Sequence, residues 1–273
     1  PVLVDVDKRT WNIDSKLIEA AITKNTKAIM PVHLYGNPCD MDEIMALAKK
    51  YNLYVIEDCA EALGAMVGYQ PVGSFGDLST VSFFANKVVT TGEGGSLQVK
   101  NDAVYAKAKQ LRDHGMRPDK RYWHDMVGFN YRLTNIQAAI GCAQLEQLGN
   151  FTKKRSDLFK LYSELFKDCN YIQEQHIRSG NISANWLYTI CLKDNFSEKR
   201  DQLMSYLKAK GIDTRPIFYP MNEMPAFNDH IEKGKFPVSQ KISYSGLSLP
   251  SSISISRDEV EYVVESVLAF INT

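Results

Sequence analysis

The first hundred residues alternate between apolar and amphipathic stretches, and this alternation constrains the fold more than any other feature. Apolar stretches cover residues 2–6, 27–34, 53–56 and 78–84. Between them, residues 14–22 and 40–51 carry apolar side chains at helical spacing, and each stretch begins near an aspartate that can cap a helix. Strands and helices that alternate at this spacing predict a parallel sheet with helices on its faces.

The second half of the chain has a different pattern. Residues 153–166 predict a long amphipathic helix that leads into a smaller C-terminal domain. In that part, residues 185–192 and 211–216 predict strands, and residues 197–210 and 258–271 predict helices. Short strands of this kind suit antiparallel pairing. We therefore expect an α/β large domain in residues 1–150 and a small α+β domain in residues 151–273.

The beginning of the chain lacks a methionine and already has the pattern of a strand. A strand with nothing before it would leave backbone groups and apolar side chains without partners. We expect that a preceding N-terminal part of the large domain is absent from this sequence.

Charge and cysteine usage exclude several classes of function. The 32 basic and 32 acidic side chains balance to a net charge of zero, which argues against a nucleic-acid partner or an anionic membrane surface. No apolar run approaches the roughly eighteen residues that a membrane span needs. The five cysteines are scattered without a C-x-x-C pair, which is typical of a reduced, cytoplasmic protein. The five histidines show no metal-ligand spacing, and we expect no metal.

Two charged side chains follow buried strands of the expected parallel sheet. Lys87 comes after the apolar stretch 78–84, and Asp58 comes after the apolar stretch 53–56. Each residue has a common structural explanation, because a surface lysine can cap a strand end and an aspartate can cap a turn. In open α/β sheets, however, the carboxyl ends of the strands meet at one edge, where ligands bind.

An amine and a carboxylate at one such edge are the groups that a pyridoxal phosphate (PLP) enzyme needs. Lys87 can form the Schiff base, since desolvation makes its amine a better nucleophile. Asp58 can hold the pyridine nitrogen of PLP protonated, so that the ring becomes an electron sink. Ser82 lies five residues before the lysine and can donate a hydrogen bond to the cofactor phosphate.

Two later loops concentrate recognition groups. Residues 121–135 combine aromatic, cationic and amide side chains, among them Asn130 and Arg132, just before a helix rich in small residues. Such a loop can line a site, or it can pack on its own chain as a surface loop. Residues 215–220 place Arg215 beside Tyr219 in a stretch stiffened by two prolines.

Three long motifs resemble the signatures of a known family. They are EDCAEALG at 57–64, SFFANKVVTTGEGG at 82–95 and GFNYRLTN at 128–135. In this order they are similar to those of the DegT/DnrJ/EryC1/StrS sugar aminotransferases, over nearly the whole chain. Three further segments, PVHLYG at 31–36, YWHD at 122–125 and RPIFYP at 215–220, resemble members that aminate C4 of a 4-keto-6-deoxy sugar nucleotide.

The resemblance implies a PLP fold type I architecture, like that of aspartate aminotransferase, with an αβα large domain. It implies that Lys87 carries the cofactor and then moves the proton, that Asp58 pairs with the pyridine nitrogen, and that Ser82 binds the phosphate. Glu61 would lie beside the cofactor ring. Asn130 would reach the cofactor phosphate of the neighbouring subunit in a homodimer with shared active sites. Residues assigned to substrate binding are Arg132, Arg215 and Tyr219.

The reaction implied is transfer of an amino group from an amino acid, L-glutamate, to a nucleotide-linked keto sugar, in the biosynthesis of the O-antigen of lipopolysaccharide. The chain departs from the family in two places. The N-terminal segment with a phosphate-binding Gly-Thr turn and a ring-stacking aromatic is absent. Residues 221–224 (MNEM) replace a loop that commonly contains histidine.

Two other functions stay open. A PLP-dependent sugar-nucleotide dehydratase of the same family would resemble this chain, but such enzymes use histidine at the lysine position, and Lys87 argues against that reading. A regulatory or binding fragment without catalysis would use the same fold. Bound PLP distinguishes the last reading, because a cofactor joined to lysine is yellow and an empty scaffold is not.

Overall fold

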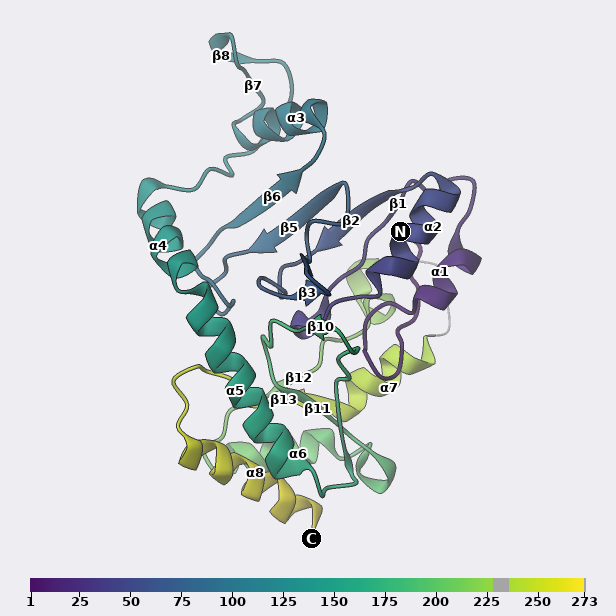
Figure 1. The fold of residues 1–273 in the computed structure, drawn as a ribbon, viewed down its shortest axis with the longest axis vertical. Helices are drawn as coiled ribbons and strands as arrows, with labels where there is room; N and C mark the ends of the chain where they lie inside the picture. Colours follow the sequence, from purple (N-terminus) through teal and green to yellow (C-terminus); the bar gives the residue numbers. More distant parts are fainter. Residues whose placement is uncertain (228–235, 273) are drawn as a thin grey trace.

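A computed structural model describes residues 1–227 and 236–272. Two sheets lie one above the other along the long axis of the molecule, as Figure 1 shows, and the long helix α5 (Leu148–Phe166) runs down one side between them. The upper sheet has the strand order β1-β2-β5-β6. Its strands are β1 (Ala28–Ile29), β2 (Tyr54–Asp58), β5 (Leu78–Ser82) and β6 (Gly95–Val99).

The parallel part of the upper sheet follows from the βαβ pattern of the sequence. Strand β1 pairs with β2 and β2 with β5 in parallel, whereas β6 returns antiparallel to β5. Helix α1 (Ser15–Ala21) begins at the Asp14 cap, and α2 (Met41–Tyr51) begins at the Asp40 cap. Helix α2 ends at Asn52, whose left-handed backbone (φ 52°) stops it. The cap positions confirm the predicted helix starts.

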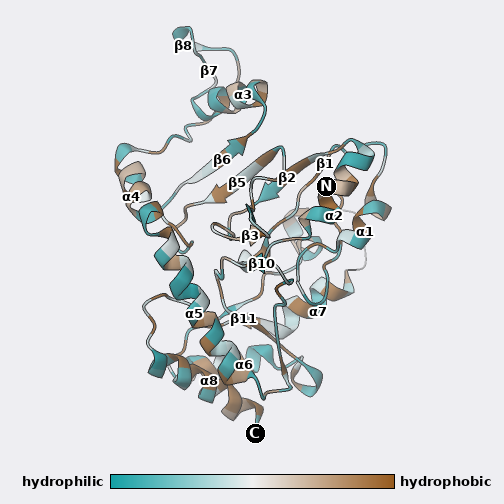
Figure 2. Ribbon diagram, in the orientation of Figure 1, coloured by the Kyte–Doolittle hydropathy of each residue, from teal (hydrophilic) through white to brown (hydrophobic). Residues whose placement is uncertain are grey.

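The lower sheet is antiparallel, in the order β12-β13-β11-β9. Its strands are β9 (Ile172–Glu174), β11 (Thr189–Leu192), β12 (Arg215–Pro216) and β13 (Gly246–Ser248). Helices α5 and α6 (Arg200–Ala209) each contact α8 (Arg257–Ile271), and the three helices share a core cluster with β9, β11 and β13. The hydrophobic residues of α8, brown in Figure 2, supply several of its buried side chains, including Val260 and Val267. The expected α+β character of this part is confirmed.

A third part extends away from the upper sheet. It contains α3 (Asp102–Arg112), the hairpin of β7 (Met116–Arg117) and β8 (Lys120–His124), and α4 (Asn135–Glu146), which leads into α5. Smaller elements complete the described fold: η1 (Leu34–Gly36), β3 (Met66–Val67), β4 (Gln70–Pro71), β10 (Asn181–Ile182), η2 (Asp194–Phe196), η3 (Met221–Glu223), η4 (Pro225–Phe227) and α7 (Pro237–Ser245). None of the helices in these described ranges has the length and apolar character needed to cross a membrane.

The prediction of a strand at residues 2–6 is wrong. The described backbone there makes a single bridge, between Val6 and Ile13. The reason is a competing set of hydrogen bonds, since the Asp5 carboxylate accepts from the backbone N–H groups of Val238 and Ser239 at the start of α7. The segment is therefore bound to α7 and not to the sheet.

Three other predicted strands are shorter than expected. Residues 27–34 give only β1 and then the turn η1, residues 185–192 give β11 from Thr189, and residues 211–216 give only β12. Beyond β1, residues 31–33 still pair with the end of β2, because the Asp58 N–H donates to the Pro31 carbonyl and the His33 N–H donates to the Asp58 carbonyl. Residues 35–36 and 184–186, at the borders of the first two stretches, bond to each other across the molecule. The Ala184 N–H donates to the Gly36 carbonyl, and the Trp186 N–H donates to the Tyr35 carbonyl.

Candidate active site

Lys87 lies in the turn that follows β5, and its amine is enclosed by two side chains from distant parts of the sequence. Its Nζ is 3.9 Å from Glu61 Oε1, and the two side chains are only 13% and 10% exposed. On the other side, Nζ lies 3.7 Å from the centroid of the Trp186 ring. The lysine is therefore held between a carboxylate and an aromatic face.

Burial changes the protonation of both partners of this ion pair. Burial lowers the pKa of Lys87, and the nearby carboxylates of Glu61 and Asp58 offset part of that effect. Burial also raises the pKa of Glu61 to about 7, against the opposing effects of the Tyr35 N–H and Lys87. Glu61 can therefore gain or lose a proton near neutral pH, and Lys87 gives up its proton more readily than an exposed lysine does.

Asp58 ends β2 at the same edge of the sheet. In the register of β2 and β5 it lies opposite Thr80, two residues before Ser82. Its Oδ1 accepts a hydrogen bond from the Ala60 N–H at 2.9 Å, while within the described ranges no donor contacts its Oδ2. The Ser82 hydroxyl accepts from the Phe84 N–H, and its own proton has no acceptor among those same residues. The carboxylate and the hydroxyl thus retain free hydrogen-bonding capacity.

The neighbouring residue, Glu57, anchors this strand end. Its buried carboxylate accepts hydrogen bonds from the N–H groups of Gly73, Phe75 and Gly76 and contacts His33 Nε2 at 3.2 Å. Burial alone would raise the pKa of Glu57, but these hydrogen bonds hold it below its ordinary value. Because the lone pairs of the carboxylate are used in this way, Glu57 fixes the backbone on which Asp58 stands.

The Trp186 ring reaches Lys87 because two loops approach each other closely. The Tyr35 N–H donates to Glu61 Oε2 at 2.6 Å, and the Tyr35 carbonyl accepts from the Trp186 N–H at 3.1 Å. Gly36 follows with φ +94°, and a Cβ there would come within 2.9 Å of the Asn185 nitrogen. Glycine at this position is what allows the two loops to pair.

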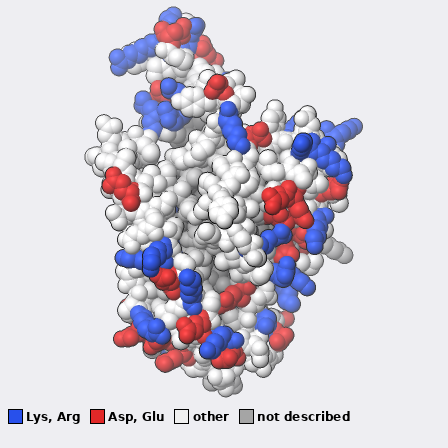
Figure 3. All heavy atoms as spheres, viewed as in Figure 1, with Lys and Arg blue, Asp and Glu red and all other residues white. Residues whose placement is uncertain are grey.

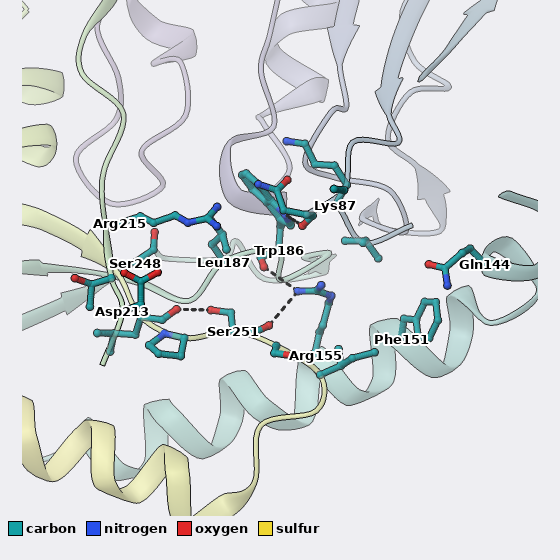
Figure 4. Close-up of a pocket in the computed structure, with 18 residues that line it drawn as sticks. Lys87, Gln144, Phe151, Arg155, Trp186, Leu187, Asp213, Arg215, Ser248 and Ser251 are labelled. Carbon is teal, nitrogen blue, oxygen red and sulfur yellow. Dashed lines mark hydrogen bonds between the residues drawn. The ribbon is translucent and has the colours of Figure 1, made fainter. Parts of the chain in front are cut away.

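A cavity of about 500 Å³ opens between the Lys87 loop and the lower sheet. Figure 4 shows Arg155 rising from α5 toward Trp186, and Arg215 extending toward the same space from β12. The Arg155 guanidinium donates to the Trp186 carbonyl at 2.8 Å, so it ties α5 to the loop that carries the ring. Polar side chains of Gln144, Ser248 and Ser251 complete much of the wall.

The structure brings together only part of the predicted site. Lys87, Asp58, Glu61 and Ser82 lie at one end of the upper sheet. Arg215 lines the adjoining cavity. These five residues come from three separate stretches of sequence.

The remaining three predicted residues lie outside this cluster. Tyr219 is 44% exposed and packs edge-on against Tyr244, with ring centroids 5.9 Å apart. Asn130 and Arg132 lie in the exposed segment between β8 and α4, where Arg132 forms an ion pair with Asp113 at 3.1 Å. Among the residues that the structure describes, neither Asn130 nor Arg132 contacts the Lys87 cluster.

Sequence reasoning missed three residues that shape the surroundings of the lysine. The sequence pattern places Trp186 in a predicted strand and Arg155 in a predicted helix, and it gives neither residue a role. Tyr35 belongs to the motif at 31–36, which assigns it no individual role. Their importance comes from contacts between distant segments, for which the local pattern gives no signal. A buried charge such as Arg155 would have been recognised only from its surroundings.

Comparison with known proteins decides the family. The model of the DegT/DnrJ/EryC1/StrS aminotransferase family matches residues 1–268. The chain belongs to this family. It is a PLP-dependent aminotransferase, and the expected PLP fold type I architecture is confirmed.

The similar curated proteins include two GDP-perosamine synthases. That of Caulobacter vibrioides is 44% identical over 268 residues, which cover 98% of this chain and 72% of that protein. That of Escherichia coli O157:H7 is 42% identical over 271 residues, which cover 99% and 72%. Among solved structures, the Helicobacter pylori aminotransferase PseC superposes with a TM-score of 0.94 at 27% identity, covering all of this chain and 74% of that one. DesV from S. venezuelae gives 0.92 at 30% identity, covering 100% and 72%.

The residues at the sheet end fit the cofactor of this family. PLP needs an amine, an anion for its pyridine nitrogen and donors for its phosphate. The Lys87 amine, the free Oδ2 of Asp58 and the unused Ser82 proton match these needs in kind. The donor set of the chain is therefore compatible with PLP.

Proposed function

We propose that the protein transfers an amino group from L-glutamate to C4 of a GDP-linked 4-keto-6-deoxy sugar. One observation carries the proposal: a buried lysine with a lowered pKa lies against Glu61 at the sheet end that bears Asp58. The identity of 42–44% to GDP-perosamine synthases supports the choice of substrate class. The chemistry needs such a lysine, because both halves of a transamination move a proton at carbon.

In this proposal bound PLP supplies the electron sink, and the chain supplies position and proton transfer. Lys87 would hold the cofactor and, with its amine free, would move the proton at the substrate carbon. Asp58 would hold the pyridine nitrogen through a charge-assisted hydrogen bond. Ser82, at the end of β5, would donate to the cofactor phosphate.

Glu61 keeps a proton close to the lysine. With a pKa of about 7, it is partly protonated at neutral pH, and its Oε1 is 3.9 Å from Lys87 Nζ. When it is ionised, a carboxyl group at that position stabilises the Lys87 ammonium; when it is protonated, this stabilisation is lost. Glu61 therefore adjusts how readily Lys87 gives up its proton beside the ring.

Substrate binding is assigned to three residues. Arg215 lines the cavity next to Lys87 and has no acidic partner among the described residues. A guanidinium in this position suits the negative groups of a sugar nucleotide. Tyr219 and Arg132 would take part from the loop beside β12 and from the segment before α4.

We also propose a homodimer with shared active sites. Apolar side chains are exposed along the segment that leads into α4 and in the first turn of α4, among them Val127 (87% exposed) and Ile136 (76%). On the face shown in Figure 3, α4 carries almost no charge. A patch of this kind favours burial against a second copy. Asn130, in the same segment, would then reach the cofactor phosphate of the partner subunit.

Subunit complementation tests the shared site. Lys87→Ala and Asn130→Ala, each impaired alone, are mixed and allowed to exchange subunits. If Asn130 serves the partner, each mixed dimer holds one site with both lesions and one with neither, so half of the wild-type activity returns per mixed dimer. If Asn130 serves its own chain, every site keeps one lesion and no activity returns.

The cellular setting follows from the same proposal. The scattered cysteines and the balanced charge favour a cytoplasmic enzyme without nucleic-acid or membrane partners. Residues 1–150 would form the cofactor-binding domain and residues 151–273 the small domain. The product, an amino-sugar nucleotide, would serve assembly of the O-antigen of lipopolysaccharide.

The substrate proposal is tested with PLP-loaded protein, L-glutamate and two sugar nucleotides. The 4-keto-6-deoxy sugar is offered as its GDP and its dTDP derivative, because a relative 37% identical is named a dTDP-4-amino-4,6-dideoxy-D-glucose transaminase. Mass spectrometry should show a 4-amino product from the GDP sugar and 2-oxoglutarate in equal amount. Faster conversion of the dTDP sugar would contradict the choice of nucleotide. Yellow protein that converts neither sugar would contradict the function.

A further inference from the structure

The Trp186 side chain is fixed in place from several directions. It is 3% exposed, and its Nε1–H donates to the Asn86 carbonyl, next to Lys87, at 2.7 Å. Its backbone N–H donates to Tyr35, and its carbonyl accepts from Arg155 at 2.8 Å. The ring also stacks on Tyr35, with centroids 6.2 Å apart. Such a ring cannot move aside without breaking its hydrogen bond to Asn86 and its stacking contact with Tyr35.

The face of this fixed ring is presented to the lysine amine. Lys87 Nζ lies 3.7 Å from the ring centroid, which is well within the distance of a cation–π contact. Among the described residues Nζ makes no hydrogen bond, so its ion pair with Glu61 and the ring are its close polar contacts. A cation–π contact is strengthened by desolvation, and the Lys87 side chain is only 13% exposed.

We propose that Trp186 is a positioning residue for Lys87, whose ring holds the free amine in its protonated form beside Glu61. The inference rests on the proposed function only in assigning a catalytic task to that amine. A lysine freed from the cofactor must stay within reach and keep the proton that it will return. The ring fixes the place, and its electron-rich face stabilises the ammonium but gives no such advantage to the neutral amine.

The charged groups around the lysine define the sign of the effect. Glu61 and Asp58 are the titratable groups that face Lys87, and both favour the ammonium, whereas burial disfavours it. The ring acts in the same direction as the two carboxylates. Replacement of the ring by an aliphatic side chain keeps the burial and removes one favourable contact, so the pKa of Lys87 falls.

The test measures that pKa in the cofactor-free full chain. Trp186→Leu and Trp186→Phe are labelled with acetic anhydride across a pH series, and the modified Lys87 peptide is quantified by mass spectrometry. The leucine variant should lower the midpoint by about half a unit to one unit. The phenylalanine variant keeps an aromatic ring with a weaker cation–π contact, so it should lower the Lys87 midpoint by less.

A matched control is Trp11, a second buried tryptophan (1% exposed) without a contact to Lys87. Trp11→Leu should lower the melting temperature and leave the Lys87 midpoint unchanged. A Lys87 midpoint that is unchanged or raised in a folded Trp186→Leu chain overturns the proposal. Where the leucine variant does not fold, an unchanged or raised midpoint in Trp186→Phe overturns it.

The proposed function can fail separately. The labelling midpoint is read without cofactor or sugar, so it does not depend on which reaction the protein catalyses. A lowered midpoint in a protein that converts neither sugar nucleotide would support the role of Trp186 and reject the function. Normal sugar conversion with an unchanged midpoint would support the function and reject the role of Trp186.

Discussion

The end of the upper sheet and the segment before α4 both carry predicted site residues, but they differ in how these residues are surrounded. At the sheet end, Lys87 and Glu61 are 13% and 10% exposed and contact each other. In the segment before α4, Asn130 and Arg132 are exposed, and Ile136, in the first turn of α4, is 76% exposed. One region is nearly enclosed by its own chain, whereas the other has apolar and polar groups with nothing over them.

The difference shows what a single chain can and cannot provide. At the sheet end, burial by residues of the same chain is enough to shift the pKa values of both Lys87 and Glu61. In the described part of the chain, the polar contacts of the Asn130 and Arg132 side chains are local, to each other and to Asp113. Their contribution to a site therefore requires another surface, and the following four experiments test that contrast.

The largest effect is expected at Lys87. Lys87→Ala removes both the attachment of the cofactor and the proton carrier, so turnover should fall by about 10⁴-fold or more. In the wild type, borohydride should fix PLP to the peptide that contains Lys87, and this label should disappear in the variant. A label on a different lysine would refute the assignment of the sheet end as the site.

Replacement of Asp58 should reduce turnover less than replacement of Lys87 does, and it should have little effect on stability. Asp58→Asn keeps the oxygen that accepts from the Ala60 N–H but loses the negative charge offered to the pyridine nitrogen. We expect turnover to fall by about 10²- to 10³-fold. The melting temperature of the cofactor-free chain should change little. A large loss of stability with turnover intact would favour the simple capping role.

The exposed segment is tested through assembly. Ile136→Asp places a charge where the proposed dimer interface would bury an apolar side chain, and it should raise the dimer dissociation constant by about a hundredfold. Analytical ultracentrifugation measures this change. The control is Tyr69→Asp, since Tyr69 is fully exposed on the turn between β3 and β4. Equal behaviour of the two variants would count against an interface at α4.

The smallest effect is a pH dependence of stability. Because the folded pKa of Glu61 is about 7 and its ordinary value is 4.5, the folded chain binds more protons between these pH values. The contribution of Glu61 to the free energy of unfolding should therefore be largest below pH 4.5, and it should be lost as the pH rises through 7. Glu61→Gln should remove on the order of 2 kcal/mol of this decline. Urea titrations of the cofactor-free wild type and variant at pH 5 and 8 measure the decline in the free energy of unfolding. The same decline in both proteins would contradict the prediction.

The sequence predicted those features that depend on neighbours along the chain. The Asp40 cap and the helical spacing of apolar residues located α2, and alternating elements located the parallel strands. The approach of Asp58 to Lys87 also followed, because the ends of neighbouring parallel strands share an edge.

Features that depend on distant contacts did not follow from the sequence. Trp186 belongs to a stretch that has the pattern of a strand, yet its backbone bonds to Tyr35 in another part of the fold. Residues 2–6 also have a strand pattern, yet Asp5 binds the start of α7. In both cases a hydrogen bond between distant segments outweighed the local preference, which a pattern of residue types does not record.

The aromatic contacts around Tyr35 have a consequence for the order in which the protein folds. The Trp186 Nε1–H joins the Asn86 carbonyl 100 positions away, and the Phe218 N–H joins the Tyr35 hydroxyl 183 positions away. Closing such long loops costs entropy that only well-formed partners can offset. The helices and parallel strands of the upper part can form early during synthesis, but the wall behind Lys87 forms only after Trp186 has left the ribosome. Folding intermediates will therefore contain the sheet edge with Asp58 while the enclosure of the lysine is still open.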